Sequence, residues 1–107
     1  MKHENYTLVF DEVILKQLKK LAKDKVTKSI ISKMLDKIEE KGPKAGKLID
    51  SKWLLFEVKE KKPPIRLYYK IVESFKEAYV FEYGMKTSHK KQQKTIEKIK
   101  KKDKLKS

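Results

Sequence analysis

Several residue types and patterns that carry common chemistries are missing from this 107-residue sequence. It contains no cysteine, which excludes disulfide bonds, thiolate metal sites and cysteine nucleophiles and fits a reducing compartment. No apolar run approaches the roughly 20 residues that a helix needs to cross a bilayer, and no signal-peptide pattern opens the chain. The three glycines form no phosphate-cradling loop of the P-loop or dinucleotide type. We therefore expect a cytoplasmic protein without membrane association.

Histidine is scarce as well, and the two histidines offer no cluster for catalysis or metal binding. His3 and His89 have no second ligand at metal-binding spacing, and no carboxylates gather near them in the sequence. Hydrolysis by a Ser-His-Asp triad is disfavoured for the same reason. We expect neither a metal nor another cofactor.

Positive charge is what the chain has in excess. Lysine and arginine total 29 against 15 acidic residues, which gives a formal net charge of +14 and a pI near 9.8. The positive electrostatic field of such a protein attracts polyanions, of which nucleic acid is the usual one. Residues 86–107 alone hold ten lysines and two acidic residues. This segment is interpreted either as a solvated tail or as an electrostatic arm for a phosphate backbone or an acidic partner protein.

Hydrophobic patterning indicates a single domain, residues 1–107, whose first half is mainly helical. Residues 6–10 form a short β-type run, after which Asp11 can cap a helix. The apolar residues of this helix recur at helical spacing and are Ile14, Leu18, Leu21 and Ala22. Thr27 is a plausible cap for a second helix that ends at Gly42 and Pro43. The apolar stripe of this second helix is Ile30, Ile31, Met34, Leu35 and Ile38. Together the two helices are predicted to form an antiparallel hairpin.

The second half of the chain is predicted to contain three strands and a basic helix. After a loop over residues 44–52, the strands cover residues 53–59, 65–72 and 77–83. The helix runs from about residue 88 to residue 101, and only Ile96 and Ile99 anchor it. Residues after about 100 are therefore expected to form a frayed basic tail.

Alternation along the strands assigns their side chains to two faces of the sheet. The face toward the helices receives Ile65, Leu67, Tyr69 and Ile71, together with Leu54, Phe56 and Val58. The opposite face receives Arg66, Tyr68 and Lys70, together with Trp53, Leu55, Glu57 and Lys59. We expect this opposite face to be open to solvent, with Trp53 serving mainly in packing.

Arg66 stands out because it is the only arginine in a chain whose other basic side chains are lysines and two histidines. The planar guanidinium can grip a phosphate at two points, which a lysine ammonium cannot do. Arg66 is therefore the first candidate for a functional residue.

The candidate residues suit metal-free cleavage of RNA. Attack by a ribose 2′-hydroxyl on the adjacent phosphate requires in-line geometry, stabilisation of developing negative charge and proton transfer. Arg66 could clamp the phosphate, and His89 or a lysine of lowered pKa could move protons. Tyr68 could stack on a base. The alternative is that the lysines are ordinary solvated side chains, that His89 has no role and that Tyr68 only covers the sheet.

The order of the predicted elements and several short segments resemble the RelE/ParE toxin superfamily, particularly its HigB-like branch. Residues 55–59 (LFEVK) resemble a strand of apolar-aromatic-Glu-apolar-Arg pattern, with Lys59 in place of the arginine. Residues 65–69 (IRLYY) resemble the following strand, whose arginine is functional in the family. Residues 83–86 (YGMK) resemble the end of the last strand, and the basic stretch 87–98 resembles the start of the terminal helix.

The resemblance implies an α+β fold of the microbial-ribonuclease-like RelE type. In that fold a helical hairpin packs on one face of a small, mainly antiparallel four-stranded sheet, in the order β-α-α-β-β-β-α. The resemblance also implies a toxin of a toxin–antitoxin pair that cuts mRNA on the ribosome without a metal. A cognate antitoxin is the implied protein partner, and mRNA is the implied substrate.

The resemblance also assigns roles to individual residues. Arg66 would bind the scissile phosphate as a catalytic residue, with Lys59 and Lys86 as basic residues of the same site. His89 could substitute for a terminal tyrosine, because no tyrosine follows Tyr83. The predicted catalytic set is Arg66, Lys86, His89 and Lys59. The predicted nucleic-acid-binding set is Tyr68, Lys70, Lys90, Lys91 and Lys94.

Two other functions stay open on the sequence. One is that of the ParE-like branch, which poisons DNA gyrase and has no nuclease activity. The other is a catalytically inactive RNA-binding homologue that keeps the fold without its acid–base residues.

Overall fold

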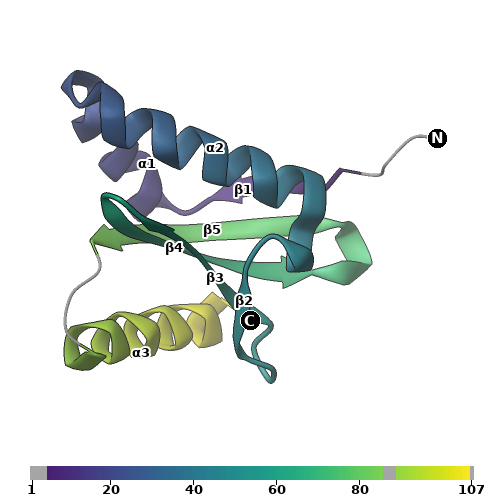
Figure 1. Ribbon diagram of the computed structural model, residues 1–107. Coiled ribbons are helices and arrows are strands. Elements are labelled where there is room, and N and C mark those ends of the chain that lie inside the picture. The colour runs from purple at the N-terminus through teal and green to yellow at the C-terminus, as the bar shows by residue number, and fades with distance from the viewer. Residues whose placement is uncertain (1–4, 86–88, 107) are drawn as a thin grey trace.

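The computed structural model describes residues 5–85 and 89–106, whose helices and strands stack in layers (Figure 1). In chain order the elements are β1 (Thr7–Phe10), α1 (Glu12–Lys20), η1 (Leu21–Lys23), α2 (Lys25–Lys41), η2 (Gly42–Lys44), β2 (Lys47–Asp50), β3 (Leu55–Lys61), β4 (Pro64–Val72), η3 (Glu73–Phe75), β5 (Glu77–Met85) and α3 (His89–Lys106). The pair α1 and α2 covers one face of the sheet, and α3 lies against the other (Figure 1). The predicted α+β class and the helical hairpin are confirmed.

Among the described residues the sheet has five strands, in the order β1-β5-β4-β3-β2. β1 runs parallel to β5, and the other neighbouring strands are antiparallel, so the sheet is mainly antiparallel as predicted. The prediction of four strands missed β2, which lies inside the predicted loop and pairs Lys47 with Glu57 of β3. A Cβ at Gly46 would collide with the backbone carbonyl of Glu57. Glycine at this position therefore allows the chain to approach β3 closely enough to pair.

Side-chain oxygens cap the N-termini of both helices of the hairpin. The Asp11 carboxylate accepts a hydrogen bond from the backbone N–H of Val13 at 3.0 Å, which confirms Asp11 as the cap of α1. Thr27 does not cap α2, because Asp24 does. The Asp24 carboxylate accepts hydrogen bonds from the Thr27 backbone N–H at 3.0 Å and from the Thr27 hydroxyl at 2.8 Å. Gly42 ends α2 with a φ of 55°, as predicted.

The main hydrophobic core lies between the hairpin and the sheet. Ile14, Ile31 and Ile38 of the two helices are fully buried there. Ile65, Leu67, Tyr69 and Ile71 of β4 face them, together with Phe56 and Val58 of β3, so the predicted face assignment is confirmed for these residues. Leu54 is the exception. It precedes β3 with a φ of 51° and is 39% exposed, so it does not follow the alternation of the strand.

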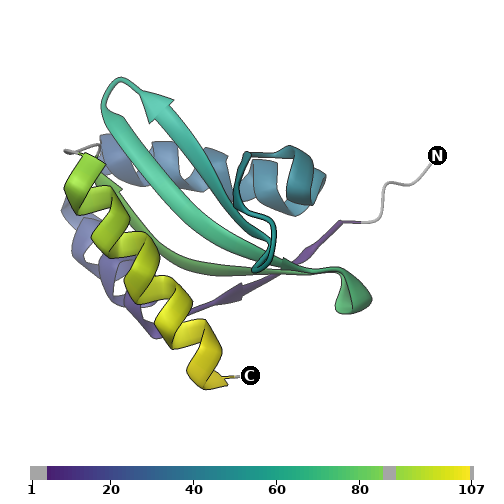
Figure 2. The same ribbon diagram turned by 90° about the horizontal axis from the view of Figure 1, so that it is seen from below.

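The opposite face of the sheet was expected to be open to solvent, but a helix covers part of it. Helix α3 lies across it (Figure 2), and Ile96 and Ile99 pack into a second apolar cluster, whose sheet residues are Leu55, Tyr68 and Phe81. The two isoleucines are 3% and 2% exposed, which confirms them as the anchors of the helix. The helix is assigned through Lys106, and the frayed tail expected after about residue 100 stays a prediction. Within the described part of the chain, no helix is long and apolar enough to cross a membrane.

Candidate nucleic-acid interface

The pairing of β3 with β4 brings the candidate residues onto one face. Lys59 lies directly opposite Arg66, and Glu57 lies directly opposite Tyr68. Because residues paired in this way project from the same side of a sheet, all four point away from the helical hairpin. On the other flank of β4, Arg66 is paired with Gly84 of β5. A Cβ at Gly84 would meet no atom of the described residues within 4 Å, so these residues leave space beside Arg66 on this flank.

Arg66 is held by a buried carboxylate. Its Nη1 lies 2.7 Å from Oε2 of Glu57, and the two side chains are 14% and 5% exposed. The amide Nε2 of Gln92, on α3, donates a second hydrogen bond to the same oxygen at 2.8 Å. Both charges have lost much of their contact with water, and the ion pair and its hydrogen bonds replace part of that contact. The three side chains therefore form a connected unit that joins β3, β4 and α3.

A groove of about 370 Å³ opens beside this unit. We call it the Arg66 groove; it is lined by Lys47, Leu48, Ile49, Glu57, Lys59, Arg66, Gln92, Gln93 and Ile96. Three cations and one carboxylate line its walls, so its formal charge is positive. Its size falls within the range of about 300–1,000 Å³ that is usual for small-ligand sites, which is large enough for part of a nucleotide chain. Two of the predicted catalytic residues, Arg66 and Lys59, thus share one groove.

Tyr68 requires a correction. The sequence predicted a ring exposed for base stacking, but Tyr68 is 3% exposed under α3. It packs in the second apolar cluster with Ile96 and Ile99. Burial, followed by the nearby charge of Glu57, raises the pKa of the Tyr68 phenol to about 12. In this arrangement Tyr68 is therefore a neutral packing residue and offers no stacking surface.

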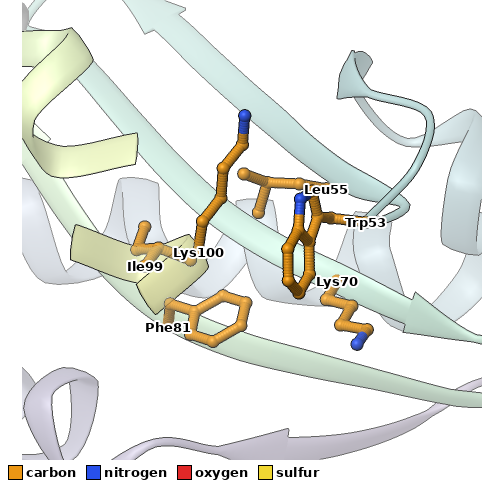
Figure 3. A pocket seen from close by; sticks show the side chains of 6 residues that line it. All are labelled: Trp53, Leu55, Lys70, Phe81, Ile99 and Lys100. Carbon is orange, nitrogen blue, oxygen red and sulfur yellow. The ribbon is translucent and has the colours of Figure 1, made fainter. Parts of the chain in front are cut away.

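Lys70 lies on the same face as Arg66 but lines a different cavity. That cavity is only about 10 Å³ and is surrounded by Trp53, Leu55, Lys70, Phe81, Ile99 and Lys100 (Figure 3). It is barely large enough for one water molecule. Trp53 packs against the second apolar cluster, as expected for a packing residue. The structure thus does not bring Lys70 into the Arg66 groove.

The remaining predicted residues lie on or before α3. Lys91 and Lys94 are exposed on this helix and do not line the Arg66 groove. Lys86 lies outside the described residues, as do the side chains of His89 and Lys90. Their predicted roles therefore stay predictions.

Sequence reasoning overlooked several groove residues. Glu57 was placed on the correct face but given no role, and Lys47 was assigned to a loop. Gln92 carried a usable signal, because it precedes the anchors Ile96 and Ile99 by four and seven residues. That spacing places all three on one side of a helix, so a docked α3 would turn Gln92 toward the sheet.

Ion pairs attach the rest of α3 to β5, to β2 and to Asp11, the residue that caps α1. Lys98 pairs with Glu82 at 3.0 Å, and the pairs Lys100–Asp50 and Lys102–Asp11 are shorter, at 2.5 Å. The acidic partners lie around the second apolar cluster, so a lysine-rich helix finds complementary charge on the surface it covers. Among the described residues there is no group of three or more His, Asp or Glu side chains that could hold a metal ion.

Comparisons with known proteins reveal similarity in structure. No protein-family model matches the chain, and no curated protein matches it. A variant of the Escherichia coli toxin RelE with two arginines replaced by alanine, solved in the free state, gives a TM-score of 0.68 at 23% identity and covers 89% of this chain and 98% of that chain. The intact E. coli RelBE toxin–antitoxin complex gives a TM-score of 0.60 at 25% identity and covers 78% of this chain and 99% of that chain. The RelBE2 toxin–antitoxin complex of Mycobacterium tuberculosis gives a TM-score of 0.62 at 17% identity and covers 81% of this chain and 98% of that chain.

The chain has the RelE toxin fold. The predicted resemblance to the RelE/ParE superfamily is thereby confirmed at the level of the fold. The matches take in 98–99% of each neighbour's chain and 78–89% of this chain. Placement in the HigB-like branch stays a prediction. Within this RelE fold, the Arg66 groove lies between β2, β3, β4 and α3.

Proposed function

We propose that this chain is the toxin of a toxin–antitoxin pair and that it cleaves mRNA in the Arg66 groove without a metal. The observation that carries the proposal is the groove itself, in which a lone arginine and two lysines from three neighbouring strands line one cleft. The structural neighbours support the toxin assignment, since they are RelE toxins solved alone or with antitoxins.

The proposed reaction is an attack of the ribose 2′-oxygen on the adjacent phosphorus. A base removes the proton of the 2′-hydroxyl, the new P–O bond closes a 2′,3′-cyclic phosphate, and the bond to the 5′-oxygen breaks. The departing oxygen takes up a proton from an acid. Negative charge grows on the non-bridging oxygens as the phosphorane forms, and fixed cations stabilise it most when they are already in place.

In this scheme Arg66 and Lys59 hold the phosphate in line. Their opposed positions on β4 and β3 place a planar fork beside a point charge, which favours one orientation of the phosphate. Lys47 adds positive charge from β2. For the proton transfers we retain His89 and Lys86 as the proposed acid and base, because both lie near the beginning of α3 in the sequence.

The proposed partner besides mRNA on the ribosome is a cognate antitoxin. A net charge of +14 favours a partner with acidic segments. If the gene beside this one encodes such a protein, its co-expression should relieve the growth arrest that the toxin causes. Persistent arrest with that protein present at equal or higher amounts would contradict the pairing.

The first test replaces Arg66 by alanine and, separately, by lysine. We expect alanine to lower the rate of RNA cleavage by about 100-fold or more, as is typical when one preorganised donor to a developing oxyanion is lost. Lysine should restore part of the rate, because it supplies charge without the fork. Gel analysis of the RNA products measures both, and EDTA should leave wild-type cleavage unchanged.

The matched control is Lys28→Ala, which removes an exposed cation on α2 away from the groove. It should cleave RNA and arrest growth as the wild type does. Full toxicity of Arg66→Ala would reject the site. Arrest with DNA breaks, a supercoiling defect and intact mRNA would instead indicate a ParE-like gyrase poison. Normal growth together with salt-sensitive RNA binding would indicate an inactive homologue.

A further inference from the structure

Among the described residues, Glu57 is the one acidic side chain that lines the otherwise basic Arg66 groove. It is 5% exposed, and a single oxygen, Oε2, accepts hydrogen bonds from both Arg66 and Gln92. A carboxylate beside a phosphate site opposes phosphate binding by repulsion, so its presence calls for a compensating role. The geometry of its contacts indicates what that role is.

The hydrogen bond between Arg66 and Glu57 uses one guanidinium N–H group. An arginine carries five such groups in a fixed plane. Among the side chains that the structure describes, the guanidinium makes this one hydrogen bond, so the plane is anchored at one corner while its other donors can meet a ligand. Anchoring one corner removes much of the rotational freedom of a long side chain before the phosphate arrives.

We propose that Glu57 is a positioning residue that orients the guanidinium of Arg66 toward the scissile phosphate, and that Gln92 of α3 holds the carboxylate in place. This inference rests on the proposed function for its consequences in catalysis. The orientation itself depends only on the three side chains and their contacts.

The charge of Glu57 has a second effect. Because it offsets the charge of Arg66, the resting groove attracts RNA less strongly than its arginine and lysines alone would. The transition state carries more negative charge on the phosphate than the ground state does, so an oriented guanidinium favours it selectively. Loss of Glu57 should therefore separate binding from catalysis, lowering the cleavage rate without weakening the binding of RNA.

The kinetic test uses Glu57→Gln, which keeps an oxygen that can accept from Arg66 but removes the charge. We expect a fall of about 10- to 100-fold in kcat, with equal or tighter binding of a 2′-O-methyl RNA oligonucleotide that lacks the attacking hydroxyl. In an Arg66→Ala background the same substitution should have no further effect on cleavage, because Glu57 acts through Arg66. Equal losses in both backgrounds, or an unchanged kcat, would overturn the proposal.

A spectroscopic test does not depend on cleavage. Because the chain has a single arginine, the Nε–H group of Arg66 gives one signal in a nitrogen-correlated NMR spectrum. Its order parameter should be high in the wild type, fall clearly in Glu57→Gln and fall partly in Gln92→Ala. The matched control is Lys100→Ala, which removes another tie between α3 and the sheet but does not touch Glu57, and it should leave the signal unchanged.

The two tests separate the two proposals. If the wild type fails to cleave mRNA on ribosomes while the Arg66 signal still loses order in Glu57→Gln, the nuclease proposal fails and the positioning role of Glu57 holds. If the wild type cleaves and Arg66→Ala does not, but the order of Arg66 and kcat are both unchanged in Glu57→Gln, only the positioning role fails.

Discussion

At the residue scale, opposed positions on neighbouring strands assemble the groove. Arg66 has Lys59 on one side and Gly84, which carries no side chain, on the other. Side chains at such positions lie about 5 Å apart, within reach of a single phosphate group. The absence of a side chain at Gly84 gives a ligand room beside Arg66 that any larger residue would reduce.

This open place can be tested with Gly84→Leu. Gly84 has no positive φ, and a Cβ at this position would meet no atom of the described part of the chain within 4 Å, so a larger residue should be accommodated at a cost within about 1 kcal/mol. We expect the leucine to project beside Arg66 and lower RNA cleavage at least 10-fold. Gly84→Ala is the matched control and should stay close to wild-type activity. Undiminished cleavage by a folded Leu variant would show that RNA does not use this flank of β4.

At the element scale, the docking of α3 decides which residues are accessible. The helix is apolar only along a narrow stripe, and its lysines meet Asp11, Asp50 and Glu82 on the surface below. Pairs as exposed as Lys98–Glu82 contribute little to stability, because water screens them. The Lys102–Asp11 pair differs, since Asp11 is 1% exposed.

Asp11 joins three elements through one carboxylate. It caps α1 at Val13, accepts a hydrogen bond from the Tyr79 hydroxyl of β5 at 2.8 Å and pairs with Lys102 of α3. We expect Asp11→Ala to lower the free energy of unfolding by about 2–4 kcal/mol, because a helix cap and buried hydrogen bonds are lost together. Urea denaturation followed by circular dichroism measures the change.

Asp11→Asn is the companion variant. In the aspartate, Oδ2 accepts from Val13 and pairs with Lys102, whereas Oδ1 accepts from Tyr79. The single amide oxygen of asparagine can replace only one of these two acceptors and carries no charge. Because alanine keeps neither acceptor, the cost of asparagine should be smaller than that of alanine. An alanine variant that loses no more than about 0.5 kcal/mol, as ordinary surface substitutions do, would contradict this account of Asp11.

At the scale of the whole molecule, the sheet lies between two helical layers of different character. The hairpin buries the larger core, and α3 closes a smaller one beside the Arg66 groove. Figure 2 shows α3 on the side of the sheet away from the hairpin. The molecule as a whole carries a net charge of +14, which should make RNA binding depend strongly on salt concentration.

The salt dependence can be predicted from the groove. If Lys47, Lys59 and Arg66 each neutralise one phosphate, log K for single-stranded RNA should fall with log salt at a slope of about −2. Binding of the 2′-O-methyl RNA oligonucleotide would then weaken roughly 20-fold between about 50 and 200 mM salt. Fluorescence anisotropy measures this slope, and Lys59→Ala should flatten it by about 0.7, whereas Lys28→Ala should not. A slope near zero would exclude phosphate binding as the basis of affinity.

Local patterns in the sequence were sufficient for much of this fold. Apolar residues recur at helical spacing around Ile14 in α1 and around Ile31 and Ile38 in α2, and side chains alternate every two residues around Arg66. Each pattern depends on a few neighbouring residues, so the hairpin and the faces of β4 could be predicted. The cap of α2 was misassigned because Asp24 and Thr27 are both suitable residue types, and only the hydrogen bonds distinguish them. The short β2 was missed because its pairing depends on contact with β3.

By itself, the sequence determined the net charge, the absence of thiol chemistry, the order of the main elements and the side of the sheet on which Arg66 lies. Only the tertiary structure decided that α3 covers that side, that Tyr68 is buried and that Arg66 is bound to Glu57. The physical reason is the separation along the sequence over which each kind of interaction acts. Periodicity acts over a few residues, whereas the Glu57–Gln92 contact joins side chains 35 positions apart and depends on how α3 buries Ile96 and Ile99.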